Sequence, residues 1–118
     1  MRDPFVVAEH QVEDLLEAAK KLRATLLGTE TLYRRTLKSL RRRSKVTATI
    51  KENRYDAARK ELTDALKDFE RQRHLALRSV ILAQLADGEN ISEIGRSWGF
   101  SRQLASRYAR EAMSRPDR

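Results

Sequence analysis

The 118-residue chain has no cysteine, two prolines and four glycines, and aromatic residues make up only 6% of it. The lack of cysteine excludes disulfides and thiolate metal sites. Because strands linked by turns draw on glycine and proline, the scarcity of both predicts an all-α fold. No apolar run is long enough to cross a bilayer, and the N-terminus lacks the apolar core of a signal peptide. We therefore expect a cytoplasmic protein.

Charged residues are abundant, at 36% of the chain, and the formal net charge is +8. This balance favours a polyanionic partner, chiefly nucleic acid, although a basic solvated surface has the same composition. His10 and His74 stand far apart and lack the spacing of metal ligands. No nucleophile–base arrangement and no glycine-rich loop after a strand is visible. The sequence thus predicts no enzyme, no cofactor and no metal site.

The N-terminal region, residues 1–73, is expected to form an amphipathic helical hairpin or coiled-coil bundle. Asp3 and Pro4 suit the N-cap and first position of a helix. Gly28 is expected to end this helix and Thr29 to cap the next. The β-branched residues after Ser44 are weak helix formers, so we expect a break or irregular turn between about residues 44 and 54. A further helix then begins at about residue 55 and has no breaker before about residue 86.

Apolar residues recur at three- and four-residue steps in two stretches of this region, 12–26 and 55–69. Such stripes are typical of helices that pack on other helices. They are candidate dimerisation surfaces, and the alternative is that they pack only on each other within one chain. The candidate residues are Val12, Leu15, Leu22, Leu26, Tyr55, Leu62 and Phe69.

A basic cluster follows in the second expected helix. Its members are Arg34, Arg35, Lys38, Arg41, Arg42, Arg43 and Lys45. One interpretation is that the cluster lies along phosphates and adds salt-sensitive affinity that does not depend on base sequence. The other is a solvated helix face, which is what charge runs usually are.

The C-terminal segment carries the most informative pattern. Asp87-Gly88 predicts a turn, and Asn90 with Glu93 fits a capping box. Gly99 is expected to end one helix in the left-handed conformation, and Ser101 to cap the next. These signals place helices at about residues 75–86, 91–98 and 102–113.

The apolar positions of this segment complete the pattern. Ile94 and Trp98 lie one turn apart and are expected to point into a core, while Gly95 is small enough to let a second helix approach. Phe100 is expected to fill the corner. Leu104, Ala105 and Tyr108 would form the buried stripe of the last helix.

The segment Ile91–Arg110, with its small residue at Gly95, its turn glycine at Gly99 and its apolar spacing, resembles the helix-turn-helix DNA-binding proteins. It is similar to the motifs of bacterial transcription regulators, of sigma-factor region four and of the DNA-binding ends of site-specific recombinases. The resemblance covers about residues 75–113. It implies that residues 74–118 are a DNA-binding domain, and the alternative is a helical corner used only for packing or protein contact.

This resemblance and the helical geometry assign roles to polar residues. Base-reading candidates are Arg102, Gln103, Ser106 and Arg107, because arginine suits the two acceptors of guanine and glutamine suits adenine. We expect Ser101 and Ser92 to touch phosphates, and Arg96 and Arg110 to hold the DNA backbone.

The leading hypothesis is a sequence-specific transcriptional regulator that binds double-stranded DNA as a homodimer, associates with the nucleoid when bound and has no membrane contact. The alternative is a coiled-coil factor that binds another regulator or a polymerase subunit. A recombinase fragment is disfavoured, because no catalytic set is visible. The operator, the direction of regulation and any effector are not specified by the sequence.

Overall fold

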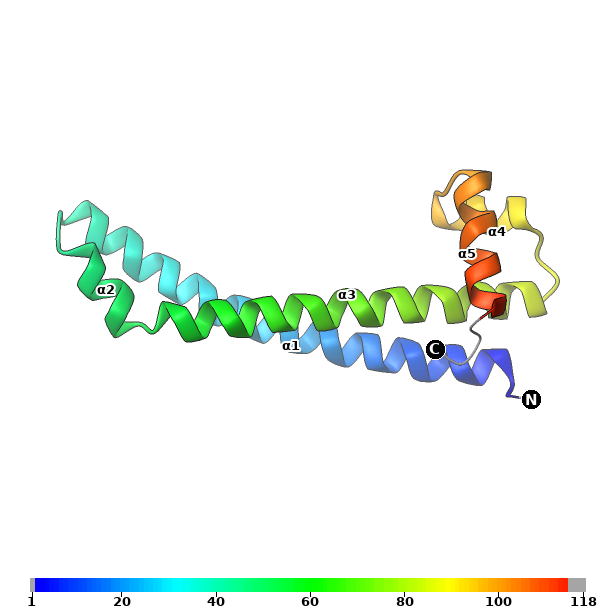
Figure 1. The fold of residues 1–118 in the computed structure, drawn as a ribbon, viewed down its shortest axis with the longest axis horizontal. Helices are drawn as coiled ribbons and strands as arrows, with labels where there is room; N and C mark the ends of the chain where they lie inside the picture. The colour runs from blue at the N-terminus through cyan, green and yellow to red at the C-terminus, as the bar shows by residue number, and fades with distance from the viewer. Residues whose placement is uncertain (1, 115–118) are drawn as a thin grey trace. The chain divides into compact units, whose positions relative to one another are not determined.

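The computed structural model describes residues 2–114, and these residues form helices without a strand (Figure 1). The elements are α1 (Pro4–Arg41), α2 (Val46–Glu52), α3 (Tyr55–Ala86), α4 (Ile91–Trp98) and α5 (Arg102–Ser114). The predicted all-α class is confirmed. Within this range, none of the helices combines the length and apolar character that a membrane crossing requires.

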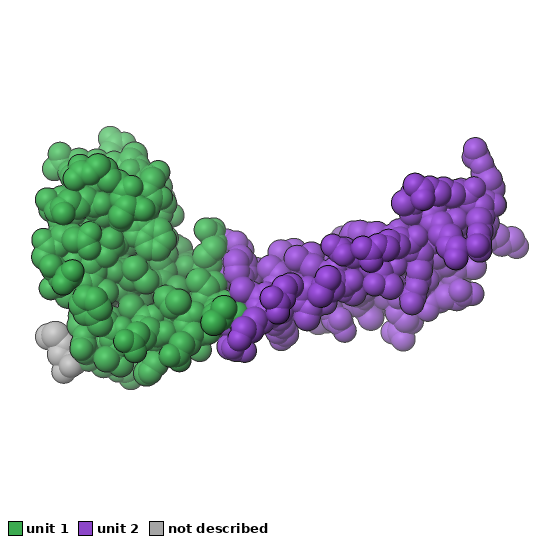
Figure 2. All heavy atoms as spheres, turned by 180° about the vertical axis from the view of Figure 1, so that it is seen from behind, with its two compact units in different colours: residues 1–16, 71–118 green, residues 17–70 purple. Residues whose placement is uncertain are grey.

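The chain divides into two compact units (Figure 2). Unit 1 contains residues 1–16 and 71–118, and unit 2 contains residues 17–70. Both α1 and α3 therefore contribute to both units. The first 16 residues group with the C-terminal helices, whereas the division expected from the sequence places them with the rest of residues 1–73.

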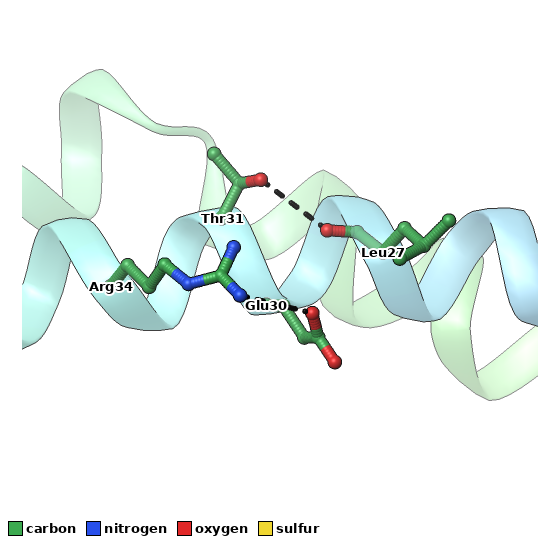
Figure 3. Close-up of polar contacts among 4 residues, drawn as sticks. All are labelled: Leu27, Glu30, Thr31 and Arg34. Atoms are coloured by element: carbon green, nitrogen blue, oxygen red, sulfur yellow. Dashed lines mark hydrogen bonds and ion pairs between the residues drawn. The ribbon is translucent and has the colours of Figure 1, made fainter.

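The first helix is longer than the sequence predicts. It runs for 38 residues through Gly28, so the prediction that Gly28 ends a helix and that Thr29 caps a second one is wrong. Thr29 is instead a buried mid-helix residue whose hydroxyl donates to the Thr25 carbonyl, as Thr31 donates to Leu27 (Figure 3). A glycine inside a helix costs only about 1 kcal/mol relative to alanine. Packing of the flanking turns outweighs that cost.

The break between the long helices is present, but it contains a helix. The chain leaves α1 at Arg41, and the β-branched segment forms the short α2 instead of an irregular turn. Tertiary hydrogen bonds support it: the Thr49 hydroxyl donates to the Ser39 hydroxyl over 2.9 Å, and Arg35 donates to the Asn53 side chain. These partners lie on α1 or just beyond α2, so local propensity did not reveal them.

In unit 2, α1 and α3 pack side by side in opposite directions (Figure 1). Tyr55, the first residue of α3, donates its hydroxyl proton to the Leu32 carbonyl of α1 over 2.9 Å and is also hydrogen-bonded to Thr36. Small side chains, including Ala18 and Ala65, are buried along this contact. The hairpin of the N-terminal region is thus formed within one chain.

Unit 1 has a small core at the C-terminal end of α3. Ile81 and Ile94 are fully buried, and Ala109 of α5 completes the cluster. Leu77 and Tyr108 pack against it from α3 and α5. The prediction that α3 continues without a break to about residue 86 is confirmed, and this end of α3 supports α4 and α5.

Candidate nucleic-acid interface

The start of α4 is fixed by reciprocal capping. The Asn90 side chain accepts a hydrogen bond from the Glu93 backbone N–H over 2.9 Å, and the Glu93 carboxylate accepts one from the Asn90 N–H over 3.2 Å. The predicted capping box is confirmed. These two hydrogen bonds satisfy backbone N–H groups that would otherwise be unpaired at the start of a helix. The capping box therefore determines locally that α4 begins at Ile91.

The corner between α4 and α5 is also built as the sequence predicts. Gly99 is left-handed, with φ of 74°, and the Phe100 N–H donates to the Gly95 carbonyl over 2.8 Å. The Ser101 hydroxyl then accepts from the Leu104 N–H over 3.1 Å. The chain therefore ends one helix and starts the next within three residues.

Close approach of the two helices depends on small residues. A Cβ added at Gly95 would lie 3.2 Å from the Phe100 carbonyl oxygen and 3.4 Å from the Ala105 Cβ. On α5, Ala105, Ala109 and Ala112 are the buried residues. This alanine seam brings the α5 backbone close to its support, and the longer side chains of α5 are left on other faces.

Trp98 corrects one expectation. Its side chain is 39% exposed and does not enter the core. The indole N–H donates to the Gln84 side chain over 2.8 Å, and the ring stacks on Phe100 with centroids 5.9 Å apart. Trp98 is the last residue of α4, and the α3 side chain that it contacts, Gln84, is polar. The indole ring therefore lies at the edge of unit 1 and not in its core. Gln84 lies 14 residues away in sequence, and no local pattern indicated this contact.

The outer face of α5 carries the predicted base-reading residues. Arg102, Gln103 and Arg107 are exposed, as is Arg110, while Ser106 is half-buried. The Arg107 guanidinium carbon lies 5.6 Å from the centroid of the Tyr108 ring, which keeps the cation at the edge of the unit. Within residues 2–114, no carboxylate forms an ion pair with the three arginines.

The other candidate contacts of this unit lie around the same helices. Ser92 is half-buried in the first turn of α4, and Arg96 is exposed in its last turn. Ser101 is exposed, and its oxygen already accepts the capping hydrogen bond, so its hydroxyl proton is the group left for a phosphate. Ser101 thus lies directly before the first turn of α5, next to Arg102.

The basic cluster lies in unit 2, at the end of α1 and in the connection to α2. Its seven residues are exposed, and Arg34 forms an ion pair with Glu30 over 3.4 Å (Figure 3). Arg35, Lys38 and Arg42 line a pocket of about 350 Å³. An exposed ion pair of this kind contributes little to stability, so Arg34 remains able to exchange its partner for a phosphate.

The candidate dimerisation residues fall into two groups. Leu15, Leu22, Tyr55, Leu62 and Phe69 are half-buried, whereas Val12 and Leu26 are more than 40% exposed. Tyr55 in particular is engaged inside the chain. The seam at Tyr55 therefore holds the intrachain hairpin, and the more exposed positions are left for other contacts.

His74 links the support helix to α5. Its ring lies edge-on to Tyr108, with centroids 6.0 Å apart, and its Nε2 is 3.7 Å from the Glu111 carboxylate. This is a packing contact, and the sequence had indicated no partner for His74. Among residues 2–114, no group of histidine and acidic side chains is arranged to hold a metal ion.

Comparison with known proteins gives no assignment. No family model, no curated protein and no solved structure matches the chain. The geometry shows a short helix held by alanines, preceded by a tight glycine corner, with exposed arginines.

Proposed function

We propose that the chain is a sequence-specific transcriptional regulator that binds double-stranded DNA by placing α5 in the major groove. The observation that carries the proposal is the set of exposed polar side chains on α5: Gln103, Arg107 and Arg110 lie opposite the buried alanine seam, and Arg102 is exposed in the first turn. The major groove admits one α-helix, and its base edges offer the acceptors and donors that arginine and glutamine pair with.

The way in which α5 is held in unit 1 supports this proposal. A recognition helix has to hold its side chains in a fixed direction, because a base contact depends on the position of individual hydrogen-bonding atoms. The cap at Ser101, the corner at Gly99 and the seam at Ala105 fix the axis and rotation of α5. We place Ser101, Ser92, Arg96 and Arg110 on the DNA backbone beside the base-reading residues.

Charge supplies the second part of the affinity. The chain carries a net charge of +8, and the basic cluster of unit 2 contributes seven cations between Arg34 and Lys45. Each phosphate neutralised by such a group releases counterions, so binding weakens as salt rises. We propose that this cluster adds contacts to the DNA backbone that do not depend on sequence.

We further propose that the protein acts as a homodimer. One good bidentate base contact provides only about 1–3 kcal/mol of discrimination, and a single α5 offers few of them. Two copies related by a twofold axis read two half-sites and so double the number of specified base pairs. A twofold-symmetric DNA site is the expected counterpart.

Selection of bound duplexes from a random pool tests the proposal directly. We expect a symmetric consensus for the parent protein and no consensus for Arg102→Ala/Arg107→Ala. The matched control is Arg59→Ala/Lys67→Ala, which removes the same charge from exposed positions of α3. Equal enrichment by the double variant in α5 and by the parent would show that α5 does not read the bases.

A second function is favoured by one observation, the apolar residues left exposed on α1, such as Phe5 and Leu16. They fit a coiled-coil factor that binds another regulator or a polymerase subunit. DNA affinity at low salt separates the two functions, because an interaction factor without DNA affinity would not shift a labelled duplex at any salt concentration.

A further inference from the structure

α1 carries two apolar stripes. The first is covered within the chain and includes the buried Ala8, Ala18, Thr29 and Ser39, of which Ser39 accepts a hydrogen bond from Thr49 of α2. The second lies to one side of the first, about 40–100° around the helix. Its members recur every seven residues: Phe5, Val12, Ala19, Leu26, Tyr33 and Leu40. Except for the half-buried Ala19, they are between 43% and 59% exposed.

Seven-residue spacing is significant for an exposed stripe. Single apolar residues on a surface are normal, but a sustained heptad repeat is the pattern by which one helix packs on another. The intrachain hairpin already uses the first stripe. The second stripe is therefore free to take a further helix.

In unit 1 the second stripe borders an apolar groove. Phe5, Val12 and Leu16 of α1 form one wall, and Val80 and Ala83 of α3 form the other, around a volume of about 550 Å³. All charged residues that line this groove are acidic, although the chain as a whole is basic: Glu9, Glu13, Asp87 and Glu89. The occupant that fits is an apolar helix with basic flanks.

In unit 2 the same helix has the complementary character. Leu26, Tyr33 and Leu40 continue the stripe, and Leu37 is exposed between them. Apart from Glu30, which pairs with Arg34, the charged residues of this part of α1 are basic, namely Arg34, Arg35, Lys38 and Arg41. This α1 segment, residues 26–41, is an apolar stripe with basic flanks.

We propose that the acidic groove of one copy binds the α1 segment 26–41 of a second copy. Because α1 is acidic near its start and basic near its end, the two α1 helices pair in antiparallel orientation. Each copy then supplies one groove and one segment, which closes a twofold dimer. The inference rests on the homodimer part of the proposed function and identifies its interface. The dimer contact is then this surface of α1 and not the apolar stripe at residues 55–69, whose Tyr55 is engaged within the chain.

Charge reversal on the full-length chain without DNA tests this pairing. Sedimentation across a concentration series gives the dimer dissociation constant. We expect Glu9→Lys/Glu13→Lys to weaken dimerisation at least tenfold, and Arg34→Glu/Lys38→Glu to do the same, because each places like charges across the interface. An equimolar mixture of the two variants should recover the parent affinity, since the reversed groups then face opposite charges.

Two further variants keep the test independent of folding. Asp14→Lys is the matched control, because Asp14 is exposed on the same helix and lies outside the groove lining, so its dimerisation should be unchanged. Leu16→Ser removes an exposed apolar side chain of the groove, and should weaken dimerisation while circular dichroism retains the helical signal.

The contrary outcomes are distinct. A parent protein that stays monomeric at every concentration would overturn the second copy as the occupant of the groove. The same holds if the monomer binds only an added basic amphipathic peptide. Dimerisation that Glu9→Lys/Glu13→Lys leaves as tight as in the parent would overturn the antiparallel arrangement, because parallel pairing sets like charges against each other both before and after this reversal. DNA binding of Glu9→Lys/Glu13→Lys and of Leu16→Ser, which lie outside the proposed DNA contacts, is measured separately and distinguishes loss of the dimer from loss of the proposed recognition helix.

Discussion

Each of the four connections between consecutive helices contains one residue in the left-handed conformation, but the residue type differs between the two units. At the end of unit 2, the left-handed residues are Arg43, with φ of 56°, and Arg54, with φ of 52°. In unit 1 they are Gly88 and Gly99, with φ of 91° and 74°. Glycine adopts this conformation without steric cost, whereas arginine does so at a cost of about 1–2 kcal/mol. Only the unit 1 connections therefore carry a glycine turn signal, whereas the break in unit 2 was expected from weak helix formers.

The short helices beside these connections differ in the same way. α4 has a capping box and two buried residues, Ile94 and Gly95. α2 has no side-chain cap at Lys45 and no buried residue. α4 is therefore specified by its own sequence and anchored in a core, whereas α2 is held by hydrogen bonding to α1.

The largest expected effect comes from the anchor of α4. Ile94→Ala should lower the free energy of unfolding by about 2–5 kcal/mol, because a fully buried side chain leaves a cavity. The counterpart Val46→Ala in α2, which is only half-buried, should cost less than about 1 kcal/mol. Urea denaturation followed by circular dichroism measures both values, and equal losses would show that α2 and α4 are anchored equally strongly.

The left-handed residues should respond with opposite signs. Gly99→Ala should destabilise by about 1–2 kcal/mol, since alanine is strained at this φ. Arg54→Gly should stabilise by up to about 1 kcal/mol, because it relieves that strain and loses only an exposed ion pair with Asp56. Gly28→Ala is the control for a helical glycine in open space and should stabilise by about 0.5–1 kcal/mol.

Thermal and urea midpoints of these three glycine variants report the sign in each case. A stabilising Gly99→Ala substitution would mean that the corner does not need its left-handed residue, and the distinction between the two connections would fail.

The smallest effect concerns the caps. Asn90→Ala removes one half of the capping box and should cost about 1 kcal/mol. Lys45→Ala, at a position whose side chain makes no capping hydrogen bond, should change stability by less than about 0.5 kcal/mol. Amide hydrogen exchange in the first turns of α4 and α2 provides a local measurement. Faster exchange in α2 of the Lys45→Ala variant would show that the Lys45 side chain does cap α2.

Features of unit 1 that depend on neighbouring residues were predictable from the sequence. The capping box at Asn90, the left-handed Gly99, the cap at Ser101 and the bounds of α4 follow from interactions within four residues. The continuous α3 followed from the absence of any breaker between residues 55 and 86. Such signals are local, so the sequence alone contains both partners.

Errors arose where a distant partner decides the outcome. Gly28 lies inside a helix because the neighbouring Thr29 is buried in the hairpin, and the cost of one glycine is small. Trp98 lies at the rim because Gln84 offers its indole a hydrogen-bond acceptor. The helical state of α2 depends on Ser39 and Arg35. None of these contacts has a signature in nearby sequence.

By itself, the sequence determined the all-helical class, the capped corner at Gly99 and which α5 residues are polar, because caps, left-handed glycines and helical periodicity act over a few residues. Only the tertiary structure decided that residues 4–41 form one helix, that Trp98 stays exposed and that one apolar stripe of α1 is covered while the next is not. These outcomes depend on which surfaces meet. Burial is gained between segments far apart in the chain, and it outweighs local preferences of about 1 kcal/mol.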